Sequence, residues 1–229
     1  MSEESAFEVT QRDPMKGDPG GAPGSGPDGD EDPRRAVFYF DLGSIYAYLA
    51  AERISRLFSD AELTQPEWQP ILLGGLFKAY GRSSWMLGPE REAGMRECER
   101  RAQQYGLMPV VWPDPVPGNT LYAMRVATYA KSIGRSVSFA LAAFRQAFAG
   151  GRDLSDPDNV AIAAAACEMH PNAIAKAAAS DGVKRRLIEA TERAGELGVR
   201  GVPTVRVGEQ LFWGDDQLEQ AVAAARAAA

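Results

Sequence analysis

Ser44 is the first residue whose type and position could do chemistry. It follows a strand-like run at residues 37–41, Val-Phe-Tyr-Phe-Asp, and precedes a helical pattern. A serine there commonly caps the helix by accepting a hydrogen bond from a free backbone amide. The same helix end exposes N–H groups and a partial positive charge, which favour an anion. A hydroxyl at that point could also donate to a thiolate and keep it ionised. Ser44 is therefore a candidate catalytic residue that need not attack anything itself.

A second candidate is the Gly-Val-Pro-Thr segment at residues 201–204. With a trans peptide bond, Pro203 would simply open a strand. With a cis bond, the backbone of Val202 would turn outward and could pair with an extended peptide. Glutathione is such a peptide, so Val202 and Pro203 are candidate cofactor-binding residues.

The third candidate is the acidic pair Asp215 and Asp216, which follows Trp-Gly at residues 213–214. Asp216 with Glu219 three residues later could form a capping box at a helix start. One of the two carboxylates could instead receive the α-amino group of a γ-glutamyl moiety through a charge-assisted hydrogen bond. Capping and binding do not exclude each other, so both functions are kept.

Cysteine and histidine usage excludes two kinds of chemistry. The two cysteines, Cys98 and Cys167, lie far apart and form no C-x-x-C motif, so we expect two free thiols and no dithiol redox activity. The single histidine, His170, precedes Pro171 and is expected at a helix end. No second histidine exists to help build a metal site, and no metal is assigned.

The elements expected around these residues follow the thioredoxin order. A strand at 37–41, a helix with apolar residues at 50, 54, 57 and 58, and a strand at about 68–73 come first. About five helices without an intervening strand follow, in a block at about 88–197. A hairpin at 203–213 with a turn at 208–209 and a final helix from about residue 215 close the chain. The predicted fold class is α/β, a thioredoxin-like fold with an all-helical insertion.

Composition sets the remaining limits. Residues 1–35 are rich in Gly, Pro and Asp and are expected to be a disordered tail, which leaves 36–229 as one domain. The formal charge of −6 argues against a nucleic-acid partner. No run of about 20 apolar residues and no secretory leader is found, so we expect no membrane association and a cytoplasmic location.

Several motifs resemble those of one family. Residues 40–50, Phe-Asp-Leu-Gly-Ser-Ile-Tyr-Ala-Tyr-Leu-Ala, resemble the D-x-x-S-P-Y-S-Y-L-A opening of 2-hydroxychromene-2-carboxylate isomerases and kappa-class glutathione transferases. Residues 72–78 resemble their L-L-G-G-I-F-K segment, and 152–157 their R-D-I-S-D-P helix start. Residues 198–204 and 211–218 resemble their G-V-x-G-V-P-T and F-W-G-x-D-R-L elements. The resemblance covers nearly everything after the tail.

The resemblance implies a DsbA-like thioredoxin fold and a homodimer. It implies that Ser44 stands where related disulfide oxidoreductases carry the first cysteine of C-x-x-C. It also implies glutathione as cofactor, with Pro203 cis, Val202 paired with the tripeptide, and Asp215 and Asp216 near its γ-glutamyl end. Cations suit a substrate carboxylate, so Lys78 and Arg82 are candidate substrate-binding residues, with solvated surface charges as the alternative.

The chain also departs from the family pattern. Ile45 replaces the usual Pro, and Ala47 replaces the second Ser or Cys position. Arg82 stands where relatives often carry Asn, Gln217 where they carry Arg, and Ala93 about where they carry Tyr. The last three departures affect expected substrate contacts more than the fold.

The function expected from the resemblance is a glutathione-dependent isomerase of the 2-hydroxychromene-2-carboxylate isomerase type, acting in aromatic-compound catabolism. Its substrate would be a small aromatic or unsaturated pyruvate-type molecule. Two alternatives stay open: a kappa-like glutathione transferase, and a non-catalytic thioredoxin-fold module that binds a thiol compound or a peptide.

Overall fold

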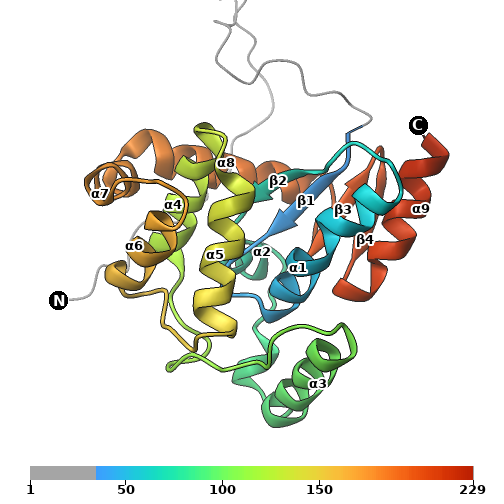
Figure 1. The fold of residues 1–229 in the computed structure, drawn as a ribbon, viewed down its shortest axis with the longest axis horizontal. Helices are drawn as coiled ribbons and strands as arrows, with labels where there is room; N and C mark the ends of the chain where they lie inside the picture. Colours follow the sequence, from blue (N-terminus) through green and yellow to red (C-terminus); the bar gives the residue numbers. More distant parts are fainter. Residues whose placement is uncertain (1–34, 229) are drawn as a thin grey trace, which may run out of the picture. The chain divides into compact units, whose positions relative to one another are not determined.

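The computed structural model describes residues 35–228, so the tail expected at 1–35 lies outside the described residues except for Arg35. The described part contains one four-stranded sheet with the order β2-β1-β3-β4. β1 pairs with β2 in parallel and with β3 antiparallel, and β3 pairs antiparallel with β4. This is the predicted thioredoxin arrangement (Figure 1). The strands are β1 (Val37–Phe40), β2 (Glu67–Pro70), β3 (Thr204–Val207) and β4 (Gln210–Trp213).

Aromatic rings on one face of the sheet form the centre of the core. Phe38 and Phe40 of β1 pack against Trp68 of β2, with ring centroids 4.9 and 5.8 Å away. Phe144 of α5 (Ser136–Phe148) lies 6.0 Å from Phe40 and 6.2 Å from Tyr48 of α1 (Ile45–Asp60). All five rings are almost fully buried. The edge-on and tilted ring contacts favour packing beyond the area they bury, and they fix the start of α1 against the sheet.

The expected second strand is wrong at its C-terminal end. β2 stops at Pro70, whereas the strand was expected to run to about residue 73, and α2 (Leu73–Ala79) begins where that strand should end. The physical reason is a long-range contact: the backbone amide of Leu73 donates to the Asp41 carboxylate at 2.8 Å. An acidic group at a helix N-terminus satisfies a free amide and favours the helix dipole. A distant residue therefore starts this helix.

The helical insertion contains six helices in the described chain rather than about five. Ser180 adopts an extended conformation, which ends α7 and starts α8 (Figure 1). A break at one residue leaves the apolar pattern on both sides intact, so the sequence did not reveal it. The helices are α3 (Arg91–Gln104), α4 (Leu121–Ser132), α5, α6 (Pro157–Ala165), α7 (Pro171–Ala179) and α8 (Asp181–Glu196). Among residues 35–228, none of the helices is long and apolar enough to cross a bilayer.

The final segment also begins later than expected. A 3-10 turn, η2 (Asp215–Gln217), precedes α9 (Leu218–Ala228). The residue before η2 is Gly214, which provides no side-chain cap. Glu219 pairs with Arg53 of α1, which ties α9 to α1.

Helix α3 is attached at its C-terminal end by polar contacts. It buries only Cys98 and Ala102. At its C-terminal end, Arg101 pairs with Asp215 at 2.8 Å, and the Tyr105 hydroxyl donates to the same carboxylate at 2.9 Å. The Arg53 guanidinium lies 3.7 Å from the centre of the Tyr105 ring. Asp215, which is 1% exposed, therefore joins α3 to the thioredoxin core.

We predict that Asp215→Asn loosens α3. The amide cannot serve both donors as an acceptor, so Arg101 or Tyr105 loses its partner and stability falls by up to about 3 kcal/mol. Hydrogen exchange should become faster in 91–104 than in α4. Asp216→Asn is the matched control because Asp216 is more than half exposed and lies 3.7 Å from Arg101. Equal exchange in the two variants would contradict this assignment.

Candidate active site

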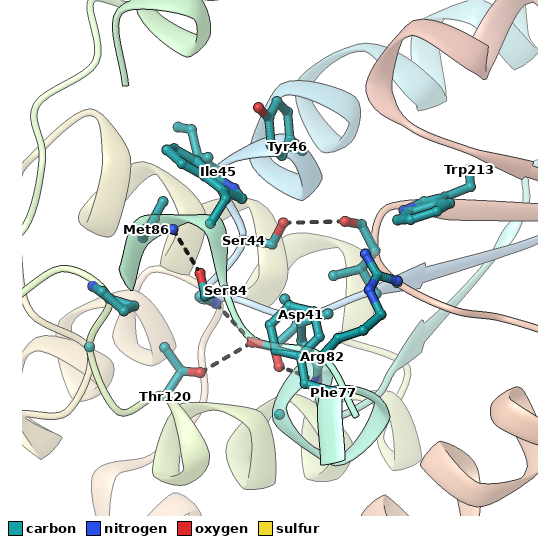
Figure 2. Close-up of a pocket in the computed structure, with 18 residues that line it drawn as sticks. Asp41, Ser44, Ile45, Tyr46, Phe77, Arg82, Ser84, Met86, Thr120 and Trp213 are labelled. Atoms are coloured by element: carbon teal, nitrogen blue, oxygen red, sulfur yellow. Dashed lines mark hydrogen bonds between the residues drawn. The ribbon is translucent and has the colours of Figure 1, made fainter. Parts of the chain in front are cut away.

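A cavity of about 320 Å³ opens between the start of α1 and the segment before β3 (Figure 2). Its lining comes from the turn after β1, the first residues of α1, helix α2, the short helix η1 (Trp85–Leu87), the turn before α4, the segment before β3 and the end of β4. Ser44, Val202 and Arg82 are among the lining residues. The cavity thus brings together three of the residues that the sequence analysis selected.

Ser44 is the N-cap of α1, as predicted. Its hydroxyl oxygen accepts from the Ala47 amide at 3.2 Å, and its own proton is directed at the Val202 carbonyl at 3.5 Å. The second contact is long for an O–H···O bond. The side chain can therefore cap the helix and still donate a hydrogen bond to an acceptor that enters the cavity.

Val202 faces Ser44 across the floor of the cavity. The peptide bond between Val202 and Pro203 is cis, as the resemblance implied. The Pro203 carbonyl accepts from the Gly214 amide at 3.0 Å, which holds the segment before β3 against the end of β4. Pro203 itself is buried and does not line the cavity.

Asp41 is a buried carboxylate beneath Ser44. One oxygen accepts from the Gly43 amide at 2.8 Å and the Thr120 hydroxyl at 3.1 Å, and the other accepts from the Leu73 amide at 2.8 Å. Burial raises the pKa of Asp41 above its ordinary 3.8, and the three donors act in the opposite direction. Asp41 and Thr120 both line the cavity.

Aromatic rings form the walls. Tyr46 and Trp85 pack together on one side with ring centroids 5.9 Å apart, and Phe77 and Trp213 also line the cavity. A methyl group on Gly94 would lie 2.3 Å from the Trp85 ring. Helix α3 can therefore approach Trp85 only because residue 94 lacks a side chain. Such walls suit a flat apolar molecule.

Arg82 is the cation among the residues that line the cavity. Its guanidinium donates to the Arg200 carbonyl at 3.0 Å and lies 5.0 Å from the centre of the Trp213 ring. These contacts hold an exposed side chain in place and leave further N–H donors for an anion. Lys78 is on α2 and exposed, whereas Arg82 follows the end of that helix; Lys78 does not line the cavity.

Asp215 and Asp216 lie outside the cavity lining. Asp215 is buried and bound by Arg101 and Tyr105. Burial, together with the Asp215 charge, raises the pKa of Tyr105 to about 12, so Tyr105 stays a donor at neutral pH. Asp216 is exposed. Of the two predicted γ-glutamyl contacts, Asp216 is the one that a ligand can reach.

The two cysteines are free and buried, as predicted. Burial raises the pKa of the Cys98 thiol to about 12, which leaves it protonated at neutral pH. His170 caps the N-terminus of α7 through its Nδ1 atom. Across residues 35–228, no cluster of three or more His, Cys, Asp or Glu side chains could hold a metal ion.

Comparison with known proteins identifies the family. The model of the DSBA-like thioredoxin domain matches residues 36–225. The chain belongs to this family. Within it, the chain is 26% identical over 185 residues to 2-hydroxychromene-2-carboxylate isomerase of Sphingobium xenophagum, covering 80% of this chain and 93% of that protein. It is 28% identical over 192 residues to the isomerase of the same name from Pseudomonas putida, covering 79% and 89%.

A solved structure of 2-hydroxychromene-2-carboxylate isomerase is also similar. It superposes with a TM-score of 0.75 at 26% identity, covering 82% of this chain and 93% of that one. The predicted DsbA-like fold with its helical insertion is therefore confirmed. The similarity extends over 89–93% of the length of these relatives.

Among the residues that line the cavity, sequence reasoning did not select Asp41, Tyr46, Trp85 or Thr120. Asp41 and Tyr46 lie within the 40–50 motif that was used for the resemblance, so only their orientation was unknown. Thr120 follows Pro-Gly-Asn at 117–119 and precedes a helix, which is typical of a cap. It makes no side-chain cap and donates to Asp41 instead.

We predict that Asp41 makes stability depend on pH. Its pKa is raised in the folded state, so the stabilisation linked to its proton is complete below about 3.8 and is lost as pH rises through the folded pKa. Asp41→Asn cannot titrate. Urea unfolding from about pH 4 to about pH 8 should show wild type losing free energy of unfolding relative to the variant as pH rises. A constant difference would contradict the raised pKa.

Proposed function

We propose that this protein is a glutathione-dependent isomerase of the 2-hydroxychromene-2-carboxylate isomerase type. The observation that carries the proposal is the Ser44 hydroxyl, which stands at the N-terminus of α1, inside an aromatic-walled cavity, with its proton directed toward Val202. The curated relatives that carry this name support it at 26–28% identity.

The residues present fit glutathione. Val202 presents its backbone next to Ser44 in the cavity, where an extended peptide could add as a short strand. Asp216 offers an exposed carboxylate to the γ-glutamyl amino group. When bound, glutathione would supply a thiolate capable of reversible conjugate addition to an unsaturated bond.

The role of the protein is to stabilise charge and to position reactants. Ser44 would donate a hydrogen bond to the glutathione thiolate and keep it ionised, and the amides at the start of α1 would add their partial positive charge. Arg82 holds the substrate carboxylate from its place beside Trp213. The Tyr46–Trp85 wall orients the flat part of the substrate. Lys78 stays a second candidate for the carboxylate, on the outer side of α2.

The wider setting is proposed with the activity. The substrate is a small aromatic or unsaturated pyruvate-type molecule from aromatic-compound catabolism, which places the enzyme in the glutathione-containing cytoplasm. The active form is a homodimer. A kappa-like glutathione transferase would use the same thiol site and differ only in the electrophile.

Glutathione titration should distinguish the contribution of Asp216 to the cofactor site from that of Ser44. In calorimetry, Asp216→Ala should weaken binding about tenfold, because one charge-assisted contact is lost. Asp60→Ala is the control, an exposed carboxylate at the other end of α1. Ser44→Ala should lose the ultraviolet absorbance of the bound thiolate while retaining most affinity. No heat at millimolar glutathione would refute the cofactor.

Ser44→Ala also removes a helix cap, which costs about 1 kcal/mol. Asp156→Ala controls for this, because Asp156 caps α6 in the same way and does not line the cavity. It should reduce stability similarly and leave the thiolate absorbance unchanged. A loss of that absorbance in both variants would assign the effect to stability alone.

A spectral assay should identify the reaction. With 2-hydroxychromene-2-carboxylate and catalytic glutathione, we expect the absorbance to change toward the open trans-hydroxybenzylidenepyruvate without consumption of the thiol. Arg82→Gln should raise KM more than it lowers kcat, because it removes a contact made in both the bound and the transition state. Stoichiometric loss of glutathione into a conjugate would instead favour the transferase.

A further inference from the structure

The cavity floor contains a carboxylate–hydroxyl pair that the thiol chemistry does not use. The Thr120 hydroxyl donates to Asp41 at 3.1 Å, and both side chains line the cavity that contains Ser44 (Figure 2). Because the Thr120 O–H is directed at Asp41, the lone pairs of the Thr120 oxygen can accept a hydrogen bond from a molecule in the cavity. Thr120 is half-buried and Asp41 is 5% exposed, so Thr120 is the member of the pair that a substrate can reach.

The proposed substrate needs a proton transfer that Ser44 does not provide. A 2-hydroxychromene is a cyclic hemiketal, and it must open before a bond in its side chain can rotate. Opening breaks the hemiketal O–H bond and the ring C–O bond. The O–H electron pair becomes the new C=O bond, and the ring oxygen leaves with the C–O pair as a phenoxide. A group that accepts the first proton and returns it to the phenoxide completes the step with no further reactant.

We propose that Thr120 and Asp41 form this proton-transfer pair. Thr120 is the catalytic residue: its oxygen takes the hemiketal proton while its own proton passes to the Asp41 carboxylate. Asp41 is the positioning residue and proton store. The reverse transfer delivers one proton to the phenoxide, so the pair ends as it began. The inference rests on the proposed function for its substrate class, but not on the cofactor, because ring opening involves no thiol.

The surroundings of Asp41 suit a carboxylate that gains and loses a proton. The amides of Gly43 and Leu73 hold both oxygens in place, so a proton can be gained without a change of rotamer. Burial disfavours the charged form, which brings the two protonation states closer in free energy. Among the residues lining the cavity, Arg82 is the charged neighbour and Tyr46 the other titratable group.

The test measures ring opening without glutathione. Exchange between 2-hydroxychromene-2-carboxylate and its cis open form is followed by NMR magnetisation transfer, with and without protein. Wild type should accelerate the exchange, and Thr120→Val, which keeps the shape without the hydroxyl, should lose about 10²-fold of that acceleration. Thr120→Ser should restore it to within about tenfold. Its recovery distinguishes a lost hydroxyl from a damaged fold.

Thr128→Val is the matched control. Thr128 is a buried threonine of α4, the helix that Thr120 precedes, and its hydroxyl donates to the Met124 carbonyl at 2.9 Å, away from the cavity lining. It should retain the exchange rate to within about twofold. The acceleration in wild type should fall at acid pH as Asp41 takes up its proton, and Asp41→Asn should lose both the acceleration and this acid limb.

The outcomes separate the two proposals. Accelerated ring opening in a protein that binds no glutathione would support the pair and refute the cofactor. Glutathione binding with no acceleration by wild type would overturn the pair and leave the cofactor. Equal exchange rates for Thr120→Val and Thr128→Val would also overturn it, as would an acid limb that persists in Asp41→Asn.

Discussion

The Asp41 carboxylate accepts hydrogen bonds from three segments that are distant in the chain: its own turn after β1, the start of α2 and the residue before α4. An ionised carboxylate removed from water is stable only when donors replace its hydration. All three segments must therefore be in place at once, and all three contribute to the cavity. The position of Ser44 follows, because its amide donates to the Asp41 carbonyl at 3.0 Å.

The cavity combines a polar floor with aromatic walls, and glycines make the combination possible. Gly94 lets α3 approach the Trp85 ring, and a methyl group on Gly201 would lie 2.9 Å from the indole nitrogen of Trp213. Rings held this closely leave a narrow space above Ser44 and Thr120. A flat molecule bound between such walls would exclude water from the hydrogen bonds on the floor. The two glycines are therefore needed for the shape of the cavity, as the polar residues are for its floor.

Local patterns predicted what depends on neighbours in the chain. The strand and helix around Ser44, its cap, and the hairpin at 204–213 follow from alternation, helical spacing and turn residues. Contacts between distant segments were not predictable. The start of α2 depends on Asp41, and the partners of Asp215 come from a helix more than 100 residues earlier. Ser44, Val202 and Arg82 meet in the cavity, whereas Pro203, Lys78 and both acidic residues lie outside its lining.

The attachment of α3 has a consequence for how the cavity responds to its medium. The sheet and α1 are held by buried aromatic rings, which carry no charge for salt to screen. The C-terminal end of α3 is held by Arg101, Tyr105 and the Asp215 carboxylate, and the Arg101 side chain is 24% exposed. Salt screens partly exposed charges more than buried apolar contacts. Dissolved ions therefore affect the attachment of α3, which packs against Trp85, more than the packing of the aromatic core.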